Sequence, residues 1–109
     1  MTFTQAVTNF AKSLPGTDSY VNLRNAMQTL IKDDSANAAV YFLIFGFART
    51  YVMLYEDQEV SPQFAEDNQK LMLSYLNTLN AALQKSNAAE LYQAMNDVVV
   101  KYEESKKVF

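Results

Sequence analysis

The stretch AAVYFLIFGFARTYVMLY, residues 38–55, constrains the fold more than any other part of this chain, because its only charged residue is Arg49. A segment of this kind is a membrane span, a surface for a partner, or a helix packed inside a soluble domain. A span needs roughly 20 mostly apolar residues. An Arg near its middle costs about 2.5–3.5 kcal/mol even on the most lenient insertion scale. The neighbouring segments therefore decide between these alternatives.

The neighbouring segments predict amphipathic helices. Apolar residues recur at three- and four-residue spacing in residues 3–14, 17–31, 62–85 and 88–102. Each of these stripes needs an apolar partner, and a helix that is hydrophobic all round is typical of the centre of a soluble bundle. We therefore predict a central helix over about residues 36–56 and no membrane span. No segment alternates with a period of two, so no strand is expected.

Short polar motifs mark the expected helix ends. Thr2 with Gln5 has the spacing of a capping box, and Asn87 with Glu90 repeats it. Further signals are the Pro15-Gly16 stop, a cap at Asp33, Asp34 or Ser35, and the Ser61-Pro62 restart. The predicted fold is all-α: a compact antiparallel bundle of about five helices, forming a single domain over residues 1–109.

Gly46 lies inside the predicted central helix, where glycine costs about 0.8–1 kcal/mol relative to alanine. Its presence predicts a close crossing by another helix. On that interpretation, leucine at this position would overpack the crossing and destabilise the fold by about 1–3 kcal/mol.

The composition excludes most catalytic chemistry. The chain has no His and no Cys, so it lacks the commonest general base, the commonest metal ligand and every thiol-based site. Asp57, Glu59 and Ser61 imitate the start of a calcium loop, but Pro62 replaces the turn glycine and Asn68 the bidentate Glu. We expect no enzyme activity, no cofactor and no metal. Because the first residues lack the basic start and apolar run of a signal peptide, a cytoplasmic location is expected.

Acidic residues are concentrated in one part of the chain. Residues 33–67 carry a net charge of −6, whereas the remainder carries +3. The densest segment, YEDQEVSPQFAED, holds five carboxylates and no base: Glu56, Asp57, Glu59, Glu66 and Asp67. Glu56 and Asp57 fall at a predicted helix C-terminus, where the helix dipole disfavours anions. A solvated loop that maintains solubility is the simpler interpretation, and a docking surface for a basic partner is the functional one.

Tyr51 and Tyr55 lie four residues apart and lead into this acidic segment. Exposed tyrosine beside carboxylates suits an interface, because the ring gives contact area at small entropic cost. The alternative is that both rings belong to the edge of the core, with their hydroxyls reaching water.

The leading functional hypothesis is a small protein-binding module that docks a basic protein through Tyr51, Tyr55 and the five carboxylates. In size, acidity and lack of catalytic groups the chain is similar to small helical immunity or antitoxin proteins, which neutralise basic nuclease toxins; no motif matches a particular family, so the similarity is one of class. Two alternatives remain: a self-associating structural protein whose fourth and fifth helices form a homodimer, and a carrier of a small apolar ligand. Nucleic acid is not expected as a ligand, because no basic stripe is present.

Overall fold

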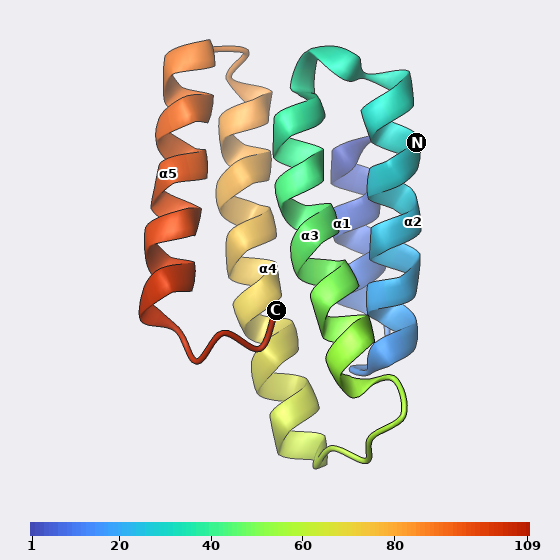
Figure 1. The fold of residues 1–109 in the computed structure, drawn as a ribbon. Coiled ribbons are helices and arrows are strands. Elements are labelled where there is room, and N and C mark those ends of the chain that lie inside the picture. Colours follow the sequence, from blue (N-terminus) through green and yellow to red (C-terminus); the bar gives the residue numbers. More distant parts are fainter.

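The computed structural model describes all 109 residues as a bundle of α-helices joined by short turns (Figure 1). The helices are α1 (Phe3–Lys12), α2 (Thr17–Asp33), α3 (Ala38–Tyr55), α4 (Pro62–Gln84) and α5 (Ala88–Glu104), and a 3-10 turn, η1 (Ser35–Asn37), precedes α3. The predicted all-α fold with an apolar central helix is confirmed.

Two of the predicted helix starts are formed by the expected side chains. The Thr2 hydroxyl accepts a hydrogen bond from the Gln5 amide at 3.1 Å, and the Gln5 side chain accepts from the Thr2 amide at 2.8 Å. This reciprocal pair is a complete capping box. At α4, the Ser61 hydroxyl accepts from the Phe64 amide at 3.0 Å, and Pro62 occupies the first helical turn, where its missing N–H is not needed.

The start of α5 forms only half of the predicted capping box. The Asn87 side chain accepts hydrogen bonds from the amides of Ala89 and Glu90 at 3.0 and 3.2 Å. The Glu90 carboxylate does not return to Asn87; it pairs with Lys85, 3.5 Å away. Asn87 therefore caps the helix alone.

Asp34 fixes the turn between α2 and α3 without capping α3 directly. Its carboxylate accepts hydrogen bonds from Asn37 at 2.8 Å and from the Tyr41 hydroxyl at 2.5 Å. These two donors favour the ionised form and lower the pKa of Asp34. Burial, together with the same bond, raises the pKa of Tyr41 to about 12. Asp34 therefore binds the side chains of Asn37 and Tyr41 at the start of α3, and it does not cap a backbone amide there.

The core lies where four helices and the tail converge. The α2 and α3 helices pack along their length as an antiparallel pair, α1 lies against α2 and α4, and α5 packs on α4 (Figure 1). Tyr20 of α2 stacks on Tyr51 of α3 with ring centroids 3.8 Å apart, and Phe10 of α1 meets Tyr20 edge-on at 5.2 Å. From α3, Phe47 reaches Tyr75 of α4 at 5.6 Å. Aromatic rings therefore connect α1 through α4.

Only one side of α3 faces the core. Ile44 and Tyr51 are fully buried, whereas Phe42 and Met53 on the opposite side are 65% and 68% exposed. Its apolar character is thus not explained by complete enclosure. The expectation of a close crossing at Gly46 is wrong, because a Cβ atom built there has no neighbour within 4 Å. Leucine at this position would face open space.

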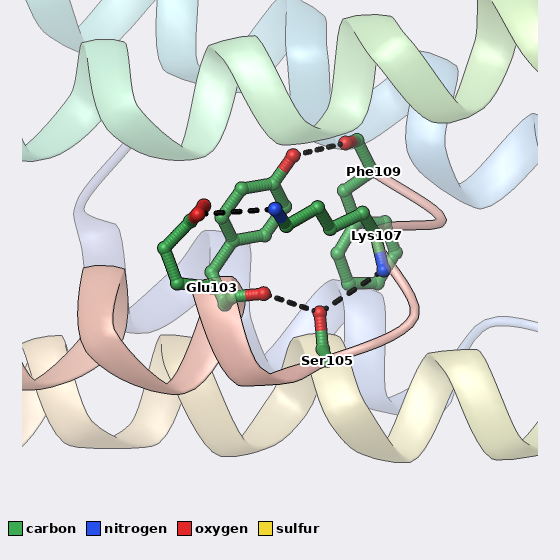
Figure 2. A network of polar contacts seen from close by, with 5 residues as sticks. Glu103, Ser105, Lys107 and Phe109 are labelled. Carbon is green, nitrogen blue, oxygen red and sulfur yellow. Dashed lines mark hydrogen bonds and ion pairs between the residues drawn. The ribbon is translucent and has the colours of Figure 1, made fainter.

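Residues 105–109 turn back from α5 and insert Phe109 into the core (Figures 1 and 2). The Phe109 ring is 3% exposed and lies 5.9–6.2 Å, centroid to centroid, from the rings of Phe47, Tyr20, Tyr51 and Tyr75. Its carbonyl oxygen accepts a hydrogen bond from the Tyr102 hydroxyl at 3.0 Å.

The return of the tail depends on a local polar network (Figure 2). Ser105 donates to the Tyr102 carbonyl at 2.6 Å and accepts from the Lys107 amide at 3.2 Å. Lys107, in a left-handed conformation with φ of 55°, forms an ion pair with Glu103 at 3.0 Å. This network directs the chain toward α3 and α4.

Replacing Phe109 with alanine should lower the free energy of unfolding by about 3–5 kcal/mol, because it removes a ring shared by four core aromatic side chains. Urea denaturation followed by far-UV circular dichroism measures the change. The matched control is Tyr92→Ala, since Tyr92 is an aromatic residue on α5 that is 69% exposed. The control should lie within about 0.5 kcal/mol of wild type, and an equally small loss for Phe109→Ala would show that the tail does not contribute to the core.

Candidate docking surface

The acidic segment forms one end of the bundle. Residues 56–61 connect α3 to α4 at the lower end of Figure 1, away from the α2–α3 and α4–α5 turns. Glu56, Asp57 and Glu59 are all exposed in this loop. None of these three carboxylates takes part in an ion pair or a side-chain hydrogen bond, so their full charge faces solvent.

The two remaining predicted carboxylates lie on the first turns of α4 and are exposed as well. Glu66 forms a loose ion pair with Lys70 at 3.9 Å, and Asp67 accepts a hydrogen bond from Gln63 at 2.7 Å. Exposed pairs of this kind neutralise little charge and contribute little stability. All five carboxylates therefore belong to the loop and the adjacent helix start, and we call them the acidic end.

The two other acidic residues of the segment 33–67 lie elsewhere in the bundle. Asp33 and Asp34 are at the α2–α3 turn, separated from the acidic end by the whole of α3. A helix of that length spans about 27 Å. Asp34 is also bonded to two side chains of its own turn. The net charge of −6 is thus divided between two ends of the bundle, a division that the sequence count did not show.

The structure corrects the prediction for Tyr51. This residue is 0% exposed, because its ring is enclosed by Tyr20 and Phe109, and it cannot contact a partner while the protein is folded. Burial raises the pKa of its hydroxyl. Tyr55 is half-buried; its ring contacts Tyr51 at 4.8 Å and the edge of Phe64 at 5.1 Å. Tyr55 alone of the two tyrosines borders the acidic end.

An apolar stripe on α3 was missed by the sequence interpretation. On the side away from the core, α3 presents Ala39, Phe42, Gly46, Arg49 and Met53. We call these five residues the outer stripe of α3. The signal was present in the sequence, since a helix that is apolar on every side has apolar residues left over once one face is buried.

Two hollows lie on the surface of the bundle. One hollow of about 500 Å³ lies between α1 and α2, and Asn9, Asn22 and Asn25 contribute to its wall. A second of about 440 Å³ lies where α4 turns into α5 and is lined by Leu83 and Met95 among others. No group of three or more acidic side chains is arranged to hold a metal ion.

Comparison of the chain with protein-family models, with curated proteins and with solved structures gave no match. By length and composition alone, residues 35–55 form one helix that is apolar enough to cross a membrane, and 39% of its most apolar window is buried inside the protein. Core helices of soluble proteins pass the same test. The exposed residues of this chain are therefore the basis for its proposed function.

Tyr20→Phe should raise stability at neutral pH by about 1 kcal/mol, because the Tyr20 hydroxyl is buried without a hydrogen-bond partner. Burial and the neighbouring Tyr51 also raise the pKa of Tyr20. A raised folded-state pKa contributes stability below the ordinary tyrosine value of about 10 that is lost as the pH rises further. The variant should therefore unfold at a higher alkaline pH than wild type.

Circular dichroism during an alkaline titration measures this midpoint, with urea denaturation at pH 7 for stability. Tyr92→Phe is the control, because Tyr92 is exposed and its replacement should leave the midpoint unchanged. Equal midpoints for wild type and Tyr20→Phe would show that the buried hydroxyl does not govern alkaline unfolding.

Proposed function

We propose that this protein is a small binding module that docks a basic protein partner through the acidic end of the bundle. The observation that carries the proposal is the set of three exposed, unpaired carboxylates at Glu56, Asp57 and Glu59, beside two more on α4. A surface of one charge sign raises the rate at which an oppositely charged partner arrives. Binding rather than catalysis fits a chain that has neither His nor Cys.

The position of these charges supports the proposal. Glu56 is the C-terminal cap residue of α3, and Asp57 follows it. The helix dipole disfavours anions at this end by about 0.3–1 kcal/mol, and no cation of the chain offsets the cost by pairing with either residue. A basic partner would supply the missing counter-charge.

Tyr55 is the proposed anchor at the edge of this surface. Its ring is held on two sides by Tyr51 and Phe64, so little conformational entropy remains to be lost when a partner covers it. Small cytoplasmic immunity or antitoxin proteins are the class that this combination fits best, with a basic toxin domain as the partner. That assignment is by analogy of size, charge and helical fold.

Replacing Glu56, Asp57 and Glu59 together with lysine should slow association with the basic partner by at least about tenfold at low salt. The dependence of the rate on salt should disappear, because steering by these charges is screened beyond roughly 8 Å at physiological ionic strength. The partner is captured by pull-down from the source cell. Surface plasmon resonance at two salt concentrations then gives the association rates.

The matched control changes the same amount of charge on another face, with the exposed Glu90, Asp97 and Glu104 on α5 replaced by lysine. If the acidic end is the docking surface, this control should retain most of the wild-type association rate. Equal slowing in both variants would mean that only net charge matters, and unchanged rates in the loop variant would leave the loop as a solvated turn. Tyr55→Ala should instead raise the dissociation rate.

A further inference from the structure

The outer stripe of α3 has the residue spacing of a helix–helix seam. Its members follow one another at intervals of three, four, three and four residues, and Glu56 continues the series after three more. This alternation defines the a and d positions of a coiled coil. Ile44 and Tyr51 occupy the f positions on the opposite side and are fully buried in the core. The seam therefore points directly away from the rest of the protein.

Nothing in the chain covers this seam. Phe42 and Met53 are 65% and 68% exposed, and Phe42 makes an aromatic contact only with Phe45 of the same helix. Arg49 is exposed and forms no ion pair or hydrogen bond within the chain. Two large apolar side chains this exposed on one face of a helix are typical of an interaction surface.

Gly46 also lacks an explanation within one copy of the protein. A side chain there would meet nothing within 4 Å, so the fold does not require glycine. Glycine is among the least favourable residues in a helix interior. A second helix that passes over this point and places a long side chain on the bare backbone would account for it.

We propose that a second copy of this chain covers the outer stripe of α3, with the two α3 helices antiparallel about a two-fold axis between Gly46 and Arg49. In this register each a position faces a d position of the other helix. Phe42 then faces Met53 of the second copy, and Arg49 lies over Gly46 of the second copy. Large residues meet small or flexible ones in every layer, and the two-fold symmetry repeats each contact.

The same register matches the charges at the helix ends. Glu56 lies opposite Ala39 of the second copy, at the start of that copy's α3. The N-terminus of α3 has no side-chain cap, since Asn37 makes no capping hydrogen bond there. The 3-10 turn η1 runs directly into α3, where the Ala38 amide donates to the Ser35 carbonyl, so the positive end of the helix dipole is what favours a carboxylate at this place. The interaction of Glu56 with the helix dipole, unfavourable at the end of its own helix, is thus favourable at the start of the other.

This complementarity favours a second copy over a lipid surface. A bilayer would accept Phe42 and Met53, but it offers no counterpart for the Arg49–Gly46 layer, and Arg49 stands in the middle of the stripe. The proposed dimer uses a different helix from the homodimer expected through α4 and α5. It shares Glu56 with the acidic end, but Phe42, Gly46 and Met53 are not part of that surface, so variants at these three positions test the dimer without changing the proposed docking surface.

Sedimentation velocity of the full chain over micromolar to submillimolar concentrations tests the proposal. Wild type should shift reversibly from monomer to dimer as the concentration rises. Phe42→Gln should remain monomeric across the range and keep its helical circular dichroism. Gly46→Leu should also remain monomeric, because leucine fills the space assigned to Arg49, while its thermal stability is equal to or higher than that of monomeric wild type. Tyr92→Gln is the control, with an aromatic residue of similar exposure on α5, and it should dimerise like wild type.

Cross-linking tests the orientation, since the chain contains no cysteine. Under mild oxidation, a mixture of Phe42→Cys and Met53→Cys chains should form the mixed disulfide. Phe42→Cys alone should not cross-link, because its two copies would lie about 16 Å apart along the helix axis, beyond the roughly 7 Å between Cα atoms that a disulfide tolerates.

Three outcomes would overturn the proposal: a monomer at every concentration, a dimer that survives Phe42→Gln, or cross-linking of Phe42→Cys to itself in preference to the mixed pair. Flotation with phosphatidylcholine and phosphatidylglycerol vesicles tests whether the stripe binds a lipid surface instead. Wild type that stays monomeric in solution but binds vesicles, with binding lost in Phe42→Gln, would assign the stripe to a lipid surface and would also overturn the second copy. None of these variants changes a residue of the acidic end, so the dimer can fail while the proposed docking of a basic partner stands.

Discussion

The stack of Tyr20 on Tyr51, with centroids 3.8 Å apart, is the contact on which the rest of the bundle depends. It joins α2 to α3, and Phe10 of α1 and Phe109 of the tail both pack against it. Stacked and edge-on rings contribute about 0.5–1.5 kcal/mol per pair beyond the area they bury. The stack also carries a cost, because both hydroxyls are buried without partners. The stack thus holds α1 and the tail against the α2–α3 pair.

This core explains why the two surfaces of interest differ in origin. Tyr51 was expected on the docking surface, but the stack holds it in the centre, so the acidic end consists of carboxylates bordered by Tyr55. The outer stripe arises from the same helix for the opposite reason. With one side of α3 committed to Tyr20 and Phe109, its remaining apolar residues have no helix of the chain to cover them.

Local signals in the sequence were sufficient to predict the helices, but they did not predict which parts of the chain pack against each helix. The Thr2–Gln5 box and the Ser61-Pro62 start involve residues within a few positions of each other, and both formed as predicted. Gly46 shows the limit: its cost in a helix is local, but whether another helix crosses there is a long-range property that the residue type does not encode. Phe109 shows the same limit, since its insertion depends on a reversal of the chain after α5 that has no periodic signal.

The size of the outer stripe indicates how strongly a second copy would be held. Burying the exposed two-thirds of Phe42 and Met53 on both copies contributes roughly 4–8 kcal/mol, whereas association costs about 4–15 kcal/mol in lost translational and rotational freedom. These two side chains alone therefore supply at most about 4 kcal/mol of net association free energy, a dissociation constant near 1 mM. The Arg49–Gly46 layers must supply the rest of the affinity, and the dimer dissociates readily. Its antiparallel helices would carry the two acidic ends on opposite sides, about 25 Å apart along the axis. Dimerisation would thus turn a single docking surface into a divalent one, and avidity toward a partner with repeated basic sites would rise with protein concentration.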